Sequence, residues 1–131
     1  MITRLQLRST KREEAFDITE KVEQVVKQAG LAEGICRLYV PHTTATIFIN
    51  ENEDPAVPKD IVRYLSELAP RGGDYQHREG NADSHIKAAL IGASVHVPIQ
   101  NGKLLLGTWQ AIFFCELDGP RQREVIIQLS H

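Results

Sequence analysis

The sequence predicts an α+β fold in a single domain that spans residues 1–131. Separate stretches carry apolar residues at helical spacing, and most other apolar residues alternate with polar ones, as they do in strands. Strand patterns dominate from Ser94 onward. With 42% hydrophobic and 24% charged residues in 131 positions, the composition is that of an ordinary globular domain with one core.

The N-terminal part contains two strand patterns and one helix pattern. Residues 2–7 and 15–18 flank a charged segment, which predicts a β-hairpin. Residues 19–29 place three valines and an alanine on one helical face. Thr19 is the predicted N-cap and Gly30 the predicted C-terminal stop, so we expect an amphipathic helix between them.

The middle of the chain predicts two strands and a second helix. β-branched and aromatic residues are enriched in residues 35–40 and 44–49, and the short link between them favours neighbouring strands. Asp54 and the following proline predict a helix start, and Pro70 ends that helix. His42, in the link, is therefore expected at a strand end.

A long loop and a third helix follow. Residues 71–83 hold three glycines and almost no aliphatic residue, and loops of this length in compact domains are usually functional or mobile. Ile86, Ala89 and Leu90 predict the apolar face of a helix that stops at Gly92.

The C-terminal segment predicts four strands. Residues 95–99 alternate, and Asn101-Gly102 is a hairpin signal that leads into a return strand at 104–106. Residues 108–117 are apolar on both faces, as expected of a central strand, whereas residues 125–129 bury one face only.

Composition and motifs exclude several functional classes. The net charge is -2 and no long basic block occurs, so we expect no nucleic-acid partner. No stretch approaches the roughly 18 apolar residues of a membrane helix, and the N-terminus lacks a signal-peptide core, so we expect a cytoplasmic protein without membrane contact. Cys36 and Cys115 are expected to be reduced and buried. The motifs of P-loop, Rossmann and serine-hydrolase enzymes are absent.

Three histidines are candidates for metal binding or proton transfer. His85 is expected in the first turn of the third helix, where the helix dipole favours the neutral imidazole. His77 precedes it in a loop with Glu79, Asn81 and Asp83, which could wrap a cation or offer N–H groups to a phosphate.

His42 is the third candidate. It precedes Thr43 and Thr44, and the next strand ends near Glu51, so a polar rim is expected at one end of the sheet. Taken singly, each of the three histidines is explained more readily as an ordinary surface or core residue, because no tight metal-binding spacing links them. The remaining histidines are expected to be solvated: His96 and His131.

The central C-terminal strand adds Gln110 and Glu116, which alternate onto one face. A carboxylate in an apolar run is costly unless it is paired or ligating, so Glu116 is a candidate catalytic group. The alternative is that the strand end emerges into solvent. Arg121 and Arg123 could pair with Glu116 or bind an anion, and Trp109 either packs in a core or interface or contacts the substrate.

A set of short motifs spans nearly the whole chain. In chain order the motifs are Pro41-His42-Thr43-Thr44-Ala45, Asn50-Glu51, Asp54-Pro55, Tyr75-Gln76-His77, Gly80-Asn81-Ala82-Asp83-Ser84-His85, Gly92-Ala93-Ser94, Leu106-Gly107-Thr108-Trp109-Gln110 and Asp118-Gly119-Pro120-Arg121. The Pro-His-Thr-Thr turn and the Leu-Gly-Thr-Trp-Gln run are the most specific of them. Together these motifs resemble the YjbQ family, from which Ser84 departs, because an alanine-like residue often precedes the histidine there.

The resemblance implies an α/β sandwich with a mixed, largely antiparallel sheet and about three helices, assembled as a homotrimer. It also implies a histidine-lined pocket for a divalent metal such as zinc or magnesium. The implied activity, in the family a secondary one, is like that of thiamine-phosphate synthase. This reaction joins a pyrimidine methyl diphosphate to a thiazole phosphate and releases pyrophosphate, whose charge a cation or cationic side chains must stabilise.

Our leading hypothesis is therefore a transferase that acts on phosphorylated small molecules. Its expected catalytic residues are His42, Glu51, His77, His85, Gln110 and Glu116, and its expected metal ligands are His42, His77 and His85. Its expected substrate contacts are Thr43, Thr44, Asn81, Asp83, Trp109 and Arg121. The alternatives are a non-catalytic module that binds an anionic or phosphorylated small molecule, and a structural trimer without a ligand.

Overall fold

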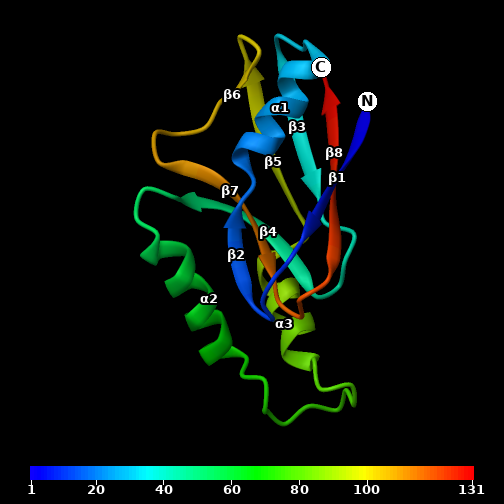
Figure 1. Ribbon diagram of the computed structural model, residues 1–131, viewed down its shortest axis with the longest axis vertical. Helices are drawn as coiled ribbons and strands as arrows, with labels where there is room; N and C mark the ends of the chain where they lie inside the picture. The colour runs from blue at the N-terminus through cyan, green and yellow to red at the C-terminus, as the bar shows by residue number, and fades with distance from the viewer.

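The computed structural model describes residues 1–131 and has two antiparallel sheets and three helices (Figure 1). The strands are β1 (Ile2–Arg8), β2 (Glu14–Asp17), β3 (Gly34–Tyr39), β4 (Ala45–Glu51), β5 (Ser94–Gln100), β6 (Lys103–Leu104), β7 (Gln110–Glu116) and β8 (Gln122–Ser130). The helices are α1 (Thr19–Ala29), α2 (Ala56–Leu68) and α3 (Ala82–Ile91). None of these helices combines the length and apolar character needed to cross a membrane. The predicted α+β class is confirmed.

The core lies between the two sheets and under α1. Sixteen buried residues form its main cluster, and they come from both sheets and from α1. In β8, Val125, Ile127 and Leu129 point into it in the predicted alternation. α2 and α3 lie together at the end of the molecule opposite the two chain termini (Figure 1). The loop that was expected to be functional joins these two helices.

The strand pairing differs from the prediction in three respects. The sheets have the orders β1-β8-β3-β5-β6 and β2-β7-β4, and every pair is antiparallel, so there is no single mixed sheet. β1 and β2 do not form the predicted hairpin, because β1 pairs with β8 and β2 with β7. β3 and β4 are likewise in different sheets. Both short links therefore cross between the sheets, and local alternation does not encode that choice.

The predicted ends of the local elements are largely confirmed. α1 stops at Gly30, whose φ of 67° suits a residue without a Cβ. At its start, however, the N-cap position is Ile18 and not the predicted Thr19, whose N–H donates to the Asp17 carboxylate at 2.8 Å. Asn101 and Gly102 form the β5–β6 turn with φ values of 54° and 76°.

α3 has nearly the predicted bounds but presents the opposite face to the protein. Ile86 and Leu90, expected in the core, are 40% and 56% exposed, whereas Asp83 and Lys87 are completely buried. The reason is an ion-pair network, in which Lys87 Nζ lies 3.0 Å from Asp83 Oδ2 and also contacts Glu13. Apolar periodicity alone therefore assigned the wrong face.

Candidate functional site

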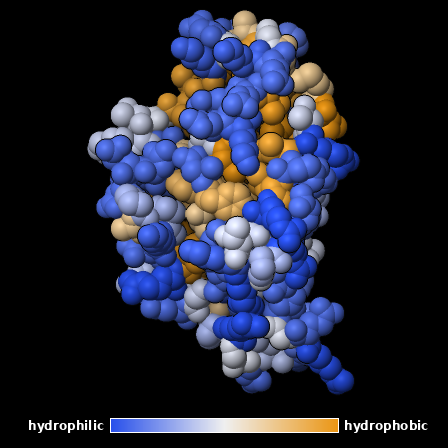
Figure 2. Space-filling model, in the orientation of Figure 1, coloured by the Kyte–Doolittle hydropathy of each residue, from blue (hydrophilic) through white to orange (hydrophobic).

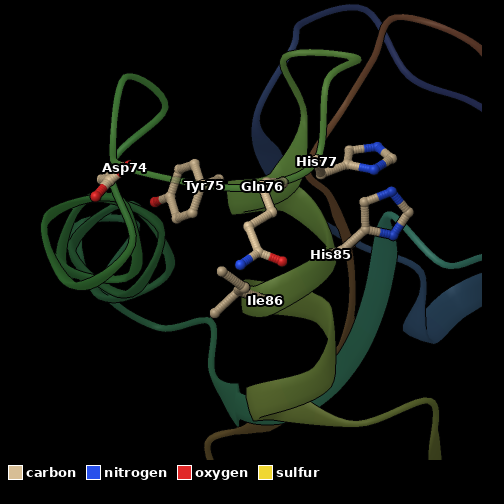
Figure 3. Close-up of a pocket in the computed structure, with 7 residues that line it drawn as sticks. Asp74, Tyr75, Gln76, His77, His85 and Ile86 are labelled. Atoms are coloured by element: carbon tan, nitrogen blue, oxygen red, sulfur yellow. The ribbon is translucent and has the colours of Figure 1, made fainter.

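The start of α3 brings His85 against His77 from the preceding loop. Their ring centroids are 5.1 Å apart and the rings meet edge to face (Figure 3). The two histidines line a hollow of about 450 Å³ together with Asp74, Tyr75, Gln76, Ala82 and Ile86. His77 Nε2 also lies 3.8 Å from Glu79 Oε2, which makes Glu79 the carboxylate nearest to this ring. The predicted pairing of His77 and His85 is thus present.

A second hollow adjoins the first through His85. It measures about 360 Å³ and is lined by His42, Thr43 and His85 together with the small residues Ala45, Ala88, Ala89, Gly92 and Ala93. Because His85 belongs to both hollows, all three candidate histidines lie along one continuous surface. We call this surface the histidine face.

Both ends of α3 are anchored, which positions His85. At the start, Arg12 NH2 lies 3.3 Å from Asp83 Oδ1, and the Ser84 hydroxyl donates to the Leu117 carbonyl at 2.6 Å. At the other end, the Thr46 hydroxyl of β4 donates to the Gly92 carbonyl. Since Asp83 is buried and paired with two cations, it holds the helix in place and does not line either hollow.

His42 differs from the other two histidines because its ring is bonded to the backbone. Its Nε2 accepts the Glu124 N–H at 3.0 Å. Burial and the nearby Arg123 guanidinium lower the pKa of His42 and so favour the neutral imidazole. The only lone pair of that imidazole is the one that Glu124 occupies.

The expected three-histidine metal site does not fit this arrangement. Nowhere in the chain do three His, Cys, Asp or Glu side chains gather in a way that could hold a metal ion. His42 would have to release the Glu124 N–H to become a ligand. A single chain therefore supplies at most the His77–His85 pair, short of the three protein ligands usual in a catalytic zinc site.

Glu116 lies in a buried ion pair and not on the histidine face. Arg123 Nε donates to its Oε1 at 2.8 Å, and the Ser9 hydroxyl donates to the same oxygen at 2.7 Å. The Leu117 and Asp118 N–H groups donate to Oε2, each at 3.1 Å. Burial alone would raise the pKa of Glu116, but these hydrogen bonds hold it below its ordinary value. The sequence correctly indicated that this carboxylate needs a partner.

Several predicted substrate contacts also take part in internal bonds. Thr44 is buried and its hydroxyl accepts from Arg123 NH2 at 2.8 Å. Asn81 Nδ2 donates to Asp118 Oδ2 at 2.9 Å, and Arg121 NH2 lies 3.2 Å from that same oxygen. Thr43, by contrast, is exposed and lines the second hollow.

Glu51, Gln110 and Trp109 lie at a different place from the histidines. They line a separate hollow of about 510 Å³. In the β4–β7 pair, Glu51 is opposite Gln110, whereas the end nearer the histidine face pairs Ala45 with Glu116. Six residues of strand separate these positions, or about 20 Å. Within one chain, the predicted catalytic set is therefore divided.

The sequence reasoning missed the residues that complete the histidine face. Tyr75 and Gln76 belong to the recognised motif but had no role, and the close-up shows Gln76 beside Ile86 on α3 (Figure 3). Arg12 and Lys87, which anchor α3, were also missed. The i,i+4 spacing of Asp83 and Lys87 was the available signal.

Known proteins share this fold and sequence. The family model described as "UPF0047 protein YjbQ-like" matches residues 3–131. The UPF0047 protein YugU of Bacillus subtilis is 48% identical over 130 residues, covering 98% of each chain. A UPF0047 protein of Methanocaldococcus jannaschii is also 48% identical, over 98% of this chain and 94% of its own.

Solved structures agree with these matches. A YjbQ/UPF0047-family protein from Clostridium acetobutylicum superimposes with a TM-score of 0.95 at 45% identity, covering 98% of this chain and 99% of its own. A hypothetical protein from Aeropyrum pernix has a TM-score of 0.95 at 37% identity, covering 99% and 98%. The chain therefore belongs to the UPF0047 family of YjbQ-like proteins.

Proposed function

We propose that the protein is a transferase that binds a phosphorylated small molecule at the histidine face and has thiamine-phosphate-synthase-like activity. The observation that carries this proposal is the His77–His85 pair, with ring centroids 5.1 Å apart over a hollow at the start of α3. Histidine side chains donate hydrogen bonds to phosphate oxygens and exchange protons near neutral pH. The type of reaction is inferred from the family resemblance.

In this reaction the C–O bond between the pyrimidine methylene and the diphosphate breaks, and pyrophosphate leaves with the electron pair. The thiazole nitrogen then forms a C–N bond to the methylene carbon. His77 and His85 would donate hydrogen bonds to the leaving pyrophosphate, which stabilises the charge that develops on it. The exposed Arg78 lies next to His77 in sequence and adds a positive charge to this loop.

The test is thiamine phosphate formation from the two phosphorylated precursors, measured with His77→Ala and His85→Ala. We expect each variant to lose on the order of 100-fold in rate at an unchanged melting temperature, because both rings lie at the surface of the hollow. His96→Ala is the matched control, since His96 is exposed on β5 and lines neither hollow. Equal turnover in all four proteins would refute the proposal.

A second candidate function is non-catalytic binding of an anionic small molecule at the same face. The observation that favours it is the absence of Glu51 and Glu116 from the two hollows, which leaves Asp74 in the lining and Glu79 beside His77 as the acidic residues near the pair. Calorimetry with pyrophosphate separates the two functions. Binding without turnover, lost in both histidine variants, would favour the binding module.

A further inference from the structure

In the link between β3 and β4, the side chain of His42 continues the hydrogen bonding between β3 and β8. The pairing of β3 with β8 ends where Tyr39 lies opposite Ile126. The next N–H along β8 that His42 reaches is that of Glu124, and the imidazole Nε2 accepts it at 3.0 Å. The side chain thus takes the place of a strand carbonyl. His42 is held in one orientation by the backbone of another sheet strand.

This bond determines which ring nitrogen carries the proton. A neutral imidazole has one N–H and one lone pair, so a ring that accepts at Nε2 must carry its proton at Nδ1. If the ring were protonated, its Nε2–H would point at the Glu124 N–H, and neither group could accept a hydrogen bond from the other. The neighbouring positive charge of Arg123 and the burial of the ring also disfavour the protonated form.

The Nδ1–H group has no acceptor within the protein. The Glu124 bond is the only hydrogen bond of the His42 ring, and the ring lines the second hollow. Apart from Thr43 and the two histidines, that hollow is lined by alanines and Gly92. The hollow thus combines an unpaired donor with small side chains along its walls, and its volume is about 360 Å³. His85 connects it to the hollow where the phosphate is proposed to bind.

We propose that the second hollow binds the neutral body of the ligand, and that His42 recognises this body by donating Nδ1–H to one of its acceptor atoms. The ligand class is a phosphate or diphosphate ester of a small, mostly apolar group with a ring nitrogen or carbonyl oxygen. This inference rests on the proposed function for the phosphate end. It assigns His42 to ligand recognition, in place of the metal ligand that the sequence suggested.

The tautomer can be tested without any ligand. In protein labelled with ¹⁵N-histidine, long-range ¹H–¹⁵N correlation spectra should show a protonated Nδ1 and an unprotonated Nε2 for His42. The signals of the His42 ring are identified as those that disappear from the spectrum of His42→Ala. A protonated Nε2, or a ring in fast exchange between tautomers, would overturn the inference whatever the protein binds.

The ligand half is tested by calorimetry with two probes, the pyrimidine methyl diphosphate and inorganic pyrophosphate. His42→Gln keeps an acceptor near the Nε2 position and removes the Nδ1 donor, so it should melt like the wild type. We expect it to bind the pyrimidine probe about tenfold more weakly and pyrophosphate unchanged. Ala89→Leu, at an exposed wall position, should show the same selective loss by filling the hollow.

The outcomes separate the two proposals. If the wild type binds both probes with equal affinity, or both variants retain wild-type preference, the inference fails and the proposed function stands. If the wild type binds neither probe, the proposed function fails, and the second hollow as a ligand subsite fails with it. His42→Asn is the converse variant, because it keeps a donor near Nδ1 and loses the acceptor. It should retain the pyrimidine preference and melt at a lower temperature.

Discussion

At the scale of single residues, burial and hydrogen bonding separate the structural polar groups from those open to a ligand. Glu116 and Asp83 are fully buried and each is bonded to cations. His77 and His85 face a hollow. His42 belongs to both groups, because one nitrogen is bonded to β8 and the ring lines the second hollow. The same residue types therefore have different roles that only their surroundings reveal.

The first prediction concerns the buried Glu116–Arg123 pair. Arg123→Met leaves a buried carboxylate without its cation, which should lower the free energy of unfolding by about 3–5 kcal/mol. Urea denaturation measures this change. The control is Arg4→Met, because the Arg4–Glu124 pair lies on the same sheet but the Arg4 side chain is 59% exposed. A loss of under about 1 kcal/mol is expected there, and equal effects would contradict the assignment.

The second prediction is the acid dependence that this pair creates. The pKa of Glu116 is lower in the folded protein than its ordinary value, so the folded state binds fewer protons than the unfolded chain. The contribution to stability is present above the ordinary carboxyl pKa and is lost as the pH falls through the lowered folded value. Stability should therefore fall as the pH is lowered from about 5 through the ordinary carboxyl pKa and on toward the lowered one.

Urea denaturation across that range measures the effect, with Glu116→Gln for comparison. This variant cannot titrate at position 116, so its stability should be lower at neutral pH and should change less on acidification. Parallel curves for the two proteins would show that Glu116 is not responsible. Asp83, whose pKa is also lowered, contributes to the acid dependence of both proteins.

At the scale of elements, α3 shows how charge decides the orientation of a helix. Its apolar residues Ile86 and Leu90 are exposed, while Lys87 and Asp83 are buried against the link between β1 and β2. Burial of a charged pair is tolerated only when every partner is present. The helix that carries His85 therefore depends on contacts with residues more than seventy positions away in sequence.

The third prediction tests this anchor. Lys87→Met removes one of the two cations that Asp83 and Glu13 share, the other being Arg12, and should lower the free energy of unfolding by about 3 kcal/mol. Amide hydrogen exchange in α3 should accelerate more than exchange in β7. Arg63→Met is the control, because the Arg63–Asp60 pair on α2 is exposed at both side chains, and its effect should stay near 0.5 kcal/mol. Unchanged exchange in α3 would contradict the anchoring role.

At the scale of the whole molecule, several large apolar side chains are exposed. Leu105 and Trp109 are 54% and 62% exposed, and Tyr64 and Leu68 on α2 are 58% and 70% exposed. The surface view shows apolar residues over the upper and middle part of one face, above a largely hydrophilic lower end (Figure 2). Exposed apolar surface of this kind is typical of proteins that self-associate.

The fourth prediction is therefore self-association, and the family resemblance specifies a homotrimer. Light scattering coupled to gel filtration should give a mass near three chains of 14.7 kDa each. Trp109→Ser should reduce that mass if the surface around Trp109 forms the contact, while His96→Ala should leave it unchanged. A single-chain mass at every micromolar concentration would contradict the prediction.

Sequence periodicity was sufficient for the local structure of this protein. The apolar stripe of α1, the stop at Gly30 and the Asn101-Gly102 turn depend on neighbouring residues, so the sequence predicts them without knowledge of the fold. The same holds for the alternation in β8 and for the need of Glu116 for a partner. The motifs that carry the family resemblance also required no structure.

Other features depended on contacts between distant segments. Strand alternation does not state which sheet a strand joins, so the separation of β1 from β2 and of β3 from β4 appeared only in the structure. The inward face of α3 depends on the charges of Arg12 and Glu13, which no local pattern connects to Lys87. The tautomer of His42 depends on one N–H of β8, eighty-two residues away. Local periodicity thus determined the elements, whereas long-range hydrogen bonds and ion pairs decided how they pack and which nitrogen atoms of the histidine face remain open to a ligand.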